Sequence, residues 1–124
     1  IFEDGVIPSE YFHNSICMIS DWSGISMEYA FTCECSVIFI DVPKKILNPD
    51  ANDLSLEPIE ISLRNKIGHI VSPENIENIP TIIKNFEKDI PDFGQLIKEI
   101  RTSIVFNVGN SAPVGAKYIQ NLVS

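Results

Sequence analysis

Hydrophobic and polar residues form alternating blocks along the chain, and these blocks predict strands and helices in alternation. Two apolar runs, residues 16–19 and 37–40, have the length of strands. The second run contains only β-branched and aromatic residues, which is typical of a strand buried on both faces of a parallel sheet. The segment between them, residues 24–33, has a composition compatible with a helix. These three elements predict a compact βαβ unit with a right-handed crossover.

The alternation continues after one long interruption. Residues 41–60 contain three prolines and have no clean period, which predicts a long loop. A helix over residues 60–67 and a short strand over 68–71 follow. Ser72 as a cap and Pro73 at the first helical position predict the start of the next helix. The remaining expected helices span residues 9–15, as a short helix or turn, residues 91–105, and a final segment capped by Ser111.

This order of elements predicts the α/β class, with a Rossmann-like parallel sheet and flanking helices. The chain of 124 residues fits a single domain, 1–124, of the kind that binds nucleotides. Only three strands are predicted, whereas the nucleotide-binding halves of doubly wound folds usually have about five or six. Because the chain also begins at Ile1 rather than methionine, we expect a truncated domain from a longer protein.

The candidate chemistry lies where the first strand passes into its helix, at the sequence Asp-Trp-Ser-Gly of residues 21–24. Ligands of open parallel sheets bind at such carboxyl ends of strands. Ser23 or Asp21 can cap the helix, and the N–H groups of Gly24, Ile25 and Ser26 carry the positive end of its dipole. The hydroxyls of Ser23 and Ser26 add two donors. The corner therefore predicts a site for a phosphate or diphosphate.

Glu28 extends this prediction by one helical turn. It lies four residues after Gly24 and therefore on the same side of the helix. The offset of about 5 Å suits a carboxylate that accepts hydrogen bonds from the ribose of a bound nucleotide. The same pattern also occurs as plain helix capping, with Glu28 an ordinary exposed residue. Spacing alone leaves both interpretations open.

Composition narrows the classes of ligand. Nine basic and seventeen acidic residues give a net charge of −8, which leaves no broad basic surface for nucleic acid or an anionic membrane. The odd number of cysteines (Cys17, Cys33 and Cys35) and the lack of a long apolar run favour the cytoplasm. The spacing of Cys33 and Cys35 does not match zinc or redox motifs, so we expect neither a metal nor a cofactor.

At these residues the chain resembles a known family. The segments SDWSGISMEYAF, SVIFIDVPKKILNP, EPIEISLRNKIGHIVSPE and FNVGNSAPVGAKYIQ occur in the family's order, and the resemblance extends from about residue 11 to about residue 122. Together they resemble the C-terminal donor-binding domain of the CDP-glycerol glycerophosphotransferases, which synthesise teichoic acids and related polymers of the cell envelope. The chain differs from more distant relatives of the family at this corner. Their sequence is Asp-Ser-Gly-Gly, whereas this chain has Asp-Trp-Ser-Gly-Ile, with Trp22 inserted and one glycine lost.

The resemblance implies the C-terminal half of a GT-B fold and transfer of an alditol phosphate from a CDP-alditol to an anionic polymer. By position, the resemblance implies that Ser23 and Gly24 hold the donor diphosphate, that Asp21 shapes the corner, and that Glu28 lies at the ribose. Lys44 and Lys45, which open the long loop, can contact the donor phosphates or the acceptor, or can be ordinary solvated lysines of the loop. Neither histidine, His13 or His69, matches a catalytic motif, so the general base stays unassigned.

Two other functions compete with this one. A GT-B glycosyltransferase or epimerase that uses a sugar nucleotide shares the same corner. A non-catalytic interaction domain can also be built on the same scaffold, because a fold does not fix a function. For the first interpretation we expect a cytoplasmic protein that contacts the inner face of the membrane only through segments outside this chain.

Overall fold

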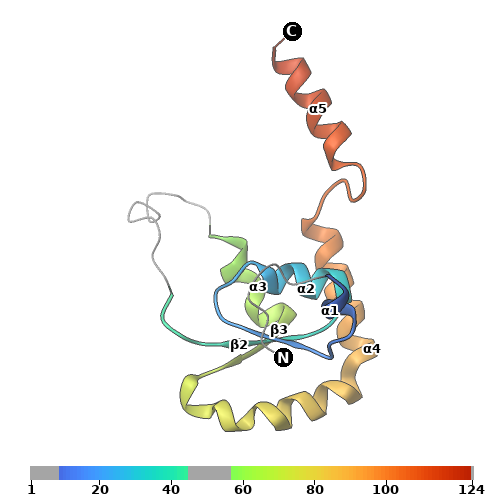
Figure 1. The fold of residues 1–124 in the computed structure, drawn as a ribbon. Helices are drawn as coiled ribbons and strands as arrows, with labels where there is room; N and C mark the ends of the chain where they lie inside the picture. Colours follow the sequence, from blue (N-terminus) through green and yellow to red (C-terminus); the bar gives the residue numbers. More distant parts are fainter. Residues whose placement is uncertain (1–8, 45–56, 124) are drawn as a thin grey trace.

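A small parallel β-sheet forms the centre of the computed structural model, which describes residues 9–44 and 57–123 (Figure 1). The strands β1 (Met18–Ser20), β2 (Val37–Ile40) and β3 (Gly68–Val71) lie side by side in that order, and both pairings are parallel. The predicted α/β class with a parallel sheet and flanking helices is confirmed for these residues. Most of the predicted long loop, residues 45–56 with Lys45, lies outside the described residues.

Helices cover both faces of the sheet. The helices α2 (Ile25–Cys33) and α3 (Ile59–Ile67) lie on one face, and η2 (Pro73–Asn78) with the first part of α4 (Ile79–Ile104) lies on the other (Figure 1). The side chains of β2 alternate between the two layers: Val37 and Phe39 join the cluster with α2 and α3, and Ile38 joins the cluster with α4. All three are buried, so the prediction of a strand covered on both faces is confirmed.

The junction between α3 and β3 depends on a glycine. The helix ends at Ile67 and the strand begins at Gly68, so no loop separates them. A Cβ atom on residue 68 would overlap the carbonyl oxygen of Val37 in the neighbouring strand. Glycine therefore lets β3 pair closely with β2 directly after the helix.

The prediction of two separate helices over the segment that follows is wrong. Ser72 precedes a 3-10 helix, η2, and makes no side-chain cap hydrogen bond there among the described residues. The single helix α4 then runs for 26 residues through Pro91. Proline lacks the N–H donor of a helix interior, and α4 changes direction along its length (Figure 1). The helix thereby contributes Phe86 to one hydrophobic cluster and Ile97 to the other.

The two terminal helices differ in their contacts. The short helix α1 (Ser9–His13), which was predicted, packs Phe12 edge-to-face against Tyr29 of α2. The last helix, α5 (Ser111–Leu122), projects from the rest of the structure and has no buried residue (Figure 1). Ser111 is its first helical residue rather than its cap, which is Asn110. The prediction of a Ser111 cap was therefore wrong by one residue.

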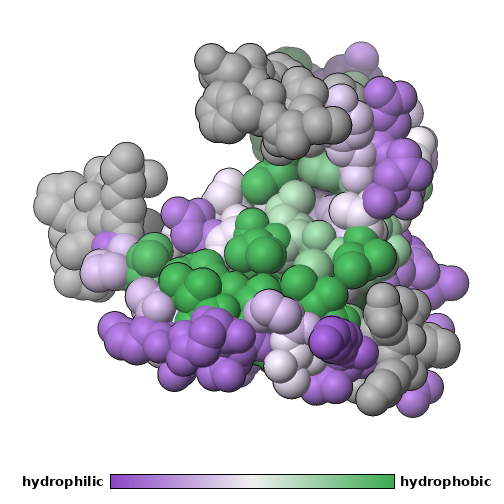
Figure 2. All heavy atoms as spheres, turned by 60° about the horizontal axis from the view of Figure 1, so that its bottom comes forward, coloured by the Kyte–Doolittle hydropathy of each residue, from purple (hydrophilic) through white to green (hydrophobic). Residues whose placement is uncertain are grey.

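The face of the sheet on the α4 side is partly uncovered. Figure 2, which brings this side forward, displays hydrophobic residues across its middle and hydrophilic residues along its rim. Ile19 of β1 pairs in register with Ile38, which is buried under α4, yet Ile19 itself is 51% exposed. The cover by α4 thus stops short of β1, whose outer edge has no strand partner among the described residues.

Candidate functional site

An open pocket of about 360 Å³ lies at the carboxyl ends of β1 and β2, the edge at which the sequence predicts a ligand. Three segments line it: the corner between β1 and α2, the residues directly after β2, and the start of α3. The lining residues are Asp21, Trp22, Ser23, Gly24, Val42, Pro43, Lys44, Pro58, Glu60 and Ile61. The pocket therefore brings together Asp21, Ser23, Gly24 and Lys44 from the predicted set.

The start of α2 supplies donors to this pocket, although not in the manner expected. Gly24 is the cap residue, with helical φ and ψ of −61° and −24°, and no side chain caps the helix within the described residues. The prediction that Ser23 or Asp21 caps α2 is therefore wrong. The consequence is that the Ser23 hydroxyl and the N–H groups of Gly24 and Ile25 have no partner in the described part of the chain. They remain available to a ligand.

Ser26 differs from the other predicted donors, because both of its donor groups already have a partner. Its hydroxyl donates to the carbonyl oxygen of Ser23 at 2.7 Å, and its N–H donates to the same oxygen at 3.2 Å. The side chain is buried. Both donors of Ser26 thus close the first turn of α2 in this structure, and the assignment of Ser26 to the phosphate stays a prediction.

Glu28 lies outside the pocket lining, exposed on α2 one turn beyond Gly24. The buried residues of α2 are Ser26, Tyr29 and Ala30, so Glu28 occupies the opposite, solvent-facing side of the helix. A ligand must extend past the pocket along α2 to contact it. The assignment of Glu28 to a ribose stays a prediction, and Glu60 is the further carboxylate that lines the pocket itself.

Trp22, the residue inserted into the corner, forms a wall of the pocket. Its indole Nε1 donates to the carbonyl oxygen of Val42 at 2.8 Å, which joins the corner after β1 to the segment after β2. The Lys44 ammonium lies 5.9 Å from the centre of the indole ring. This contact places one cation beside the pocket, as predicted for Lys44, and within the range of a cation–π interaction.

Sequence reasoning missed Arg64, which lies directly behind this wall. It is only 4% exposed, and its guanidinium carbon lies 3.7 Å from the centre of the Trp22 ring. A signal was present in the sequence, because Arg64 follows Ile61 and precedes Ile67 by three residues each. An arginine within the apolar stripe of a helix is rarely buried unless its guanidinium has partners.

The remaining candidate groups lie away from the pocket. Among the described residues, neither His13 nor His69 lines it, and the His69 ring packs on Phe86 at a centroid distance of 5.1 Å. Burial raises the pKa of the Cys17 and Cys33 thiols, and the proximity of Cys35 raises it further. Such thiols stay protonated at neutral pH, and the described residues contain no cluster suited to a metal ion.

No family model, curated protein or solved structure matches the chain. Over the ranges that the structure describes, none of the helices combines the length and apolar character needed to cross a bilayer. The function must therefore be argued from the pocket and from the sequence resemblance.

Proposed function

We propose that this domain binds the nucleotide donor of a CDP-glycerol glycerophosphotransferase-like enzyme with a GT-B fold. The observation that carries the proposal is the composition of one pocket. It combines donors for an anion, from Ser23, Gly24 and Lys44, with the two carboxylates of Asp21 and Glu60.

These two kinds of group suit the two ends of a CDP-alditol. Free N–H groups at a helix N-terminus, a hydroxyl and a lysine favour the diphosphate. Carboxylates repel phosphate but accept hydrogen bonds from sugar or alditol hydroxyls. A plain inorganic phosphate would use only the first kind of group. A ligand with a diphosphate and neighbouring hydroxyls would use both, and Glu28 can add a further acceptor along α2.

The reaction proposed for the complete enzyme is attack of an acceptor hydroxyl oxygen on the β-phosphorus of the CDP-alditol. The bond from that phosphorus to the bridging oxygen breaks, CMP leaves, and the acceptor proton passes to a base. In this scheme the present domain positions the donor and offsets charge on the leaving phosphate. The acceptor is an anionic polymer of the cell envelope, which Lys44 can also meet. Neither His13 nor His69 lines the pocket, and in this scheme the general base comes from elsewhere in the enzyme.

Calorimetric titration of the chain with CMP, CDP and CDP-glycerol tests this proposal. We expect millimolar or tighter binding of the cytidine nucleotides, and about tenfold weaker binding for Ser23→Ala, which removes a hydrogen bond to a charged group. Ser103→Ala is the control, because its exposed hydroxyl donates to Ile100 O within α4, away from the pocket. The proposal fails if wild type and Ser23→Ala are equally indifferent to every nucleotide.

The same titration separates the competing functions. Stronger binding of UDP or GDP than of CDP would favour a glycosyltransferase or epimerase that uses a sugar nucleotide. Indifference to all nucleotides would instead favour a non-catalytic interaction domain.

A further inference from the structure

We propose that Arg64 is a positioning residue of the nucleotide pocket, which holds the indole ring of Trp22 as a fixed wall for the ligand. This inference rests on the proposed function and adds a residue that acts without touching the ligand.

The guanidinium of Arg64 contacts two aromatic rings. Its guanidinium carbon lies 3.7 Å from the ring centre of Trp22 and 5.1 Å from that of Phe39. The residue is 4% exposed, so water does not compete for these contacts. A desolvated guanidinium on an indole face is the strongest of the common cation–π arrangements. Arg64 thereby fixes the plane of the Trp22 ring.

The end of β2 in turn fixes Arg64. Its Nη1 lies 3.3 Å from Asp41 Oδ1, in an ion pair, and its Nη2 donates to the carbonyl oxygen of Ile40 at 3.3 Å. The Nε has no hydrogen-bond partner among the described residues. The arginine thus meets two acceptors at the carboxyl end of one strand and a ring from the neighbouring corner. These contacts with the end of β2 fix the position of the Arg64 side chain.

Trp22 separates Arg64 from the ligand pocket. The indole lines a small cavity that Arg64 also lines and the larger pocket that Lys44 lines, whereas Arg64 does not line the larger one. The hydrogen bond from Nε1 to Val42 O holds the ring edge, and Arg64 holds one face. With edge and face both held, the ring presents a preformed surface to the pocket.

A preformed wall lowers the entropic cost of binding, because the side chain is already ordered in the free protein. Loss of the guanidinium would free the indole to adopt other rotamers, and the ligand would then have to order it. The effect of Arg64 should therefore appear both in the mobility of Trp22 without ligand and in the affinity for nucleotide.

Arg64→Lys tests this inference, because lysine keeps the charge but lacks the planar fork. Trp22 is the single tryptophan of the chain, so its fluorescence reports on this wall alone. We expect acrylamide to quench Trp22 more strongly in the variant, and the Kd for CDP to rise about tenfold. Arg101→Lys is the matched control: Arg101 also donates to one carbonyl and one carboxylate, but it does so at the far end of α2.

A second variant keeps the inference testable if Arg64→Lys does not fold. Asp41→Ala removes the carboxylate that pairs with Arg64. The Asp41 side chain is about half exposed and does not line the pocket. The variant should shift quenching and Kd in the same direction by a smaller factor. Unchanged quenching and unchanged Kd in a folded variant would overturn the role of Arg64 while nucleotide binding by the wild type stands. If the wild type binds no CDP, the proposed function fails and this inference fails with it.

Discussion

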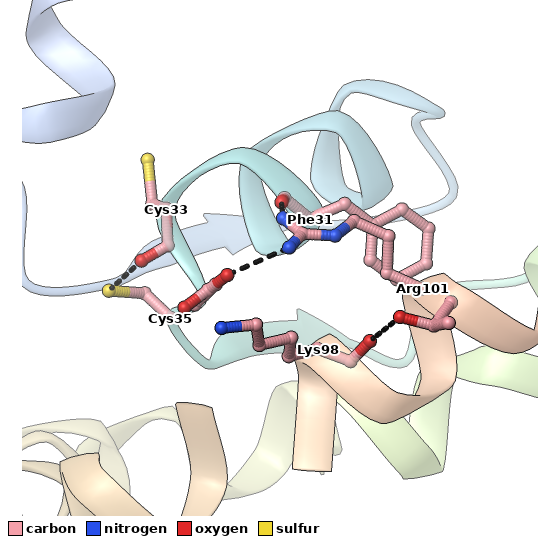
Figure 3. Close-up of polar contacts among 7 residues, drawn as sticks. Phe31, Cys33, Cys35, Lys98 and Arg101 are labelled. Atoms are coloured by element: carbon pink, nitrogen blue, oxygen red, sulfur yellow. Dashed lines mark hydrogen bonds and ion pairs between the residues drawn. The ribbon is translucent and has the colours of Figure 1, made fainter. Parts of the chain in front are cut away.

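Arg101 and Glu34 form an ion pair in which Nη2 lies 2.9 Å from Oε1, so the second half of α4 holds the residue that caps the end of α2. The Nη1 of the same arginine donates to the carbonyl oxygen of Phe31 in the last turn of α2 (Figure 3). Glu34 has a φ of 55°, in the left-handed region that few residues other than glycine adopt. One side chain thus satisfies a terminal carbonyl, pairs the capping residue, and places a cation at the negative end of the helix dipole.

Replacing Arg101 with methionine should lower the free energy of unfolding by about 1–2 kcal/mol, because the Phe31 carbonyl loses its donor. The ion pair itself adds little, since both of its side chains are partly exposed. Urea unfolding measures the loss. Lys98→Met removes a positive charge one turn earlier on the same helix and should cost less than about 0.5 kcal/mol. Equal midpoints for the two variants would contradict the assigned role of Arg101.

Gly68→Ala should destabilise the sheet, because the added methyl group overlaps Val37 O and lies 2.9 Å from Phe39 Cε2. The neighbours are backbone and a buried ring, so neither can move aside easily. A loss of roughly 1–3 kcal/mol is expected from such overpacking. Thermal unfolding measures it, with Gly115→Ala on α5 as the control, where an added Cβ meets no atom within 4 Å. A melting temperature equal to that of the control would argue against close pairing at Gly68.

The strands and the helix α2 were predictable because short-range patterns determine them. The run 37–40 is apolar enough to be buried from both sides, and the structure buries it. The first strand begins two residues later than the apolar run at Ile16, which is exposed. The break expected before Pro91 does not occur, because α4 packs on both hydrophobic clusters and tertiary contacts outweigh one lost hydrogen bond.

The location of the candidate site was predictable from the sequence, but the side-chain contacts within it were not. A strand followed by Asp-Trp-Ser-Gly places the corner at the ligand edge of the sheet, and the pocket lies there. That Ser26 turns inward to Ser23 O, and that Arg64 stacks on Trp22, depends on contacts between segments distant in sequence. Periodicity carries no information about such contacts.

Gly24→Ala should separate stability from binding. Gly24 has ordinary helical angles, and an added Cβ would meet no atom within 4 Å. Alanine should therefore leave the free energy of unfolding unchanged or raise it by about 0.4–1 kcal/mol, since it restricts the unfolded chain. If a phosphate approaches this backbone closely, the same methyl group should weaken CDP binding about tenfold or more. Urea unfolding measures the change in the free energy of unfolding, and calorimetry on the same preparation measures the change in CDP affinity. Undiminished CDP affinity would place the phosphate away from Gly24.

Stability should fall at alkaline pH because the core holds protonated groups. Burial raises the pKa of the Tyr29 hydroxyl far above its ordinary value of 10.0, and burial raises the pKa of the Cys17 and Cys33 thiols above 9.0. The folded state then keeps protons that the unfolded chain releases. The stabilising contribution is therefore complete below about pH 9 and is lost as the pH rises, by up to about 1.4 kcal/mol per pH unit for each group.

Tyr29→Phe isolates the contribution of the phenol. The Tyr29 hydroxyl donates to the carbonyl oxygen of Ser15 at 3.3 Å, so the variant should lose about 1 kcal/mol near neutral pH. Between about pH 10 and about pH 11 its unfolding free energy should fall less steeply than that of the wild type, because one fewer proton is released on unfolding. Urea unfolding at several pH values under reducing conditions measures both slopes, and Tyr118→Phe on exposed α5 is the matched control. Parallel slopes for Tyr29→Phe and the wild type would mean that the Tyr29 hydroxyl titrates alike in the folded and unfolded chain.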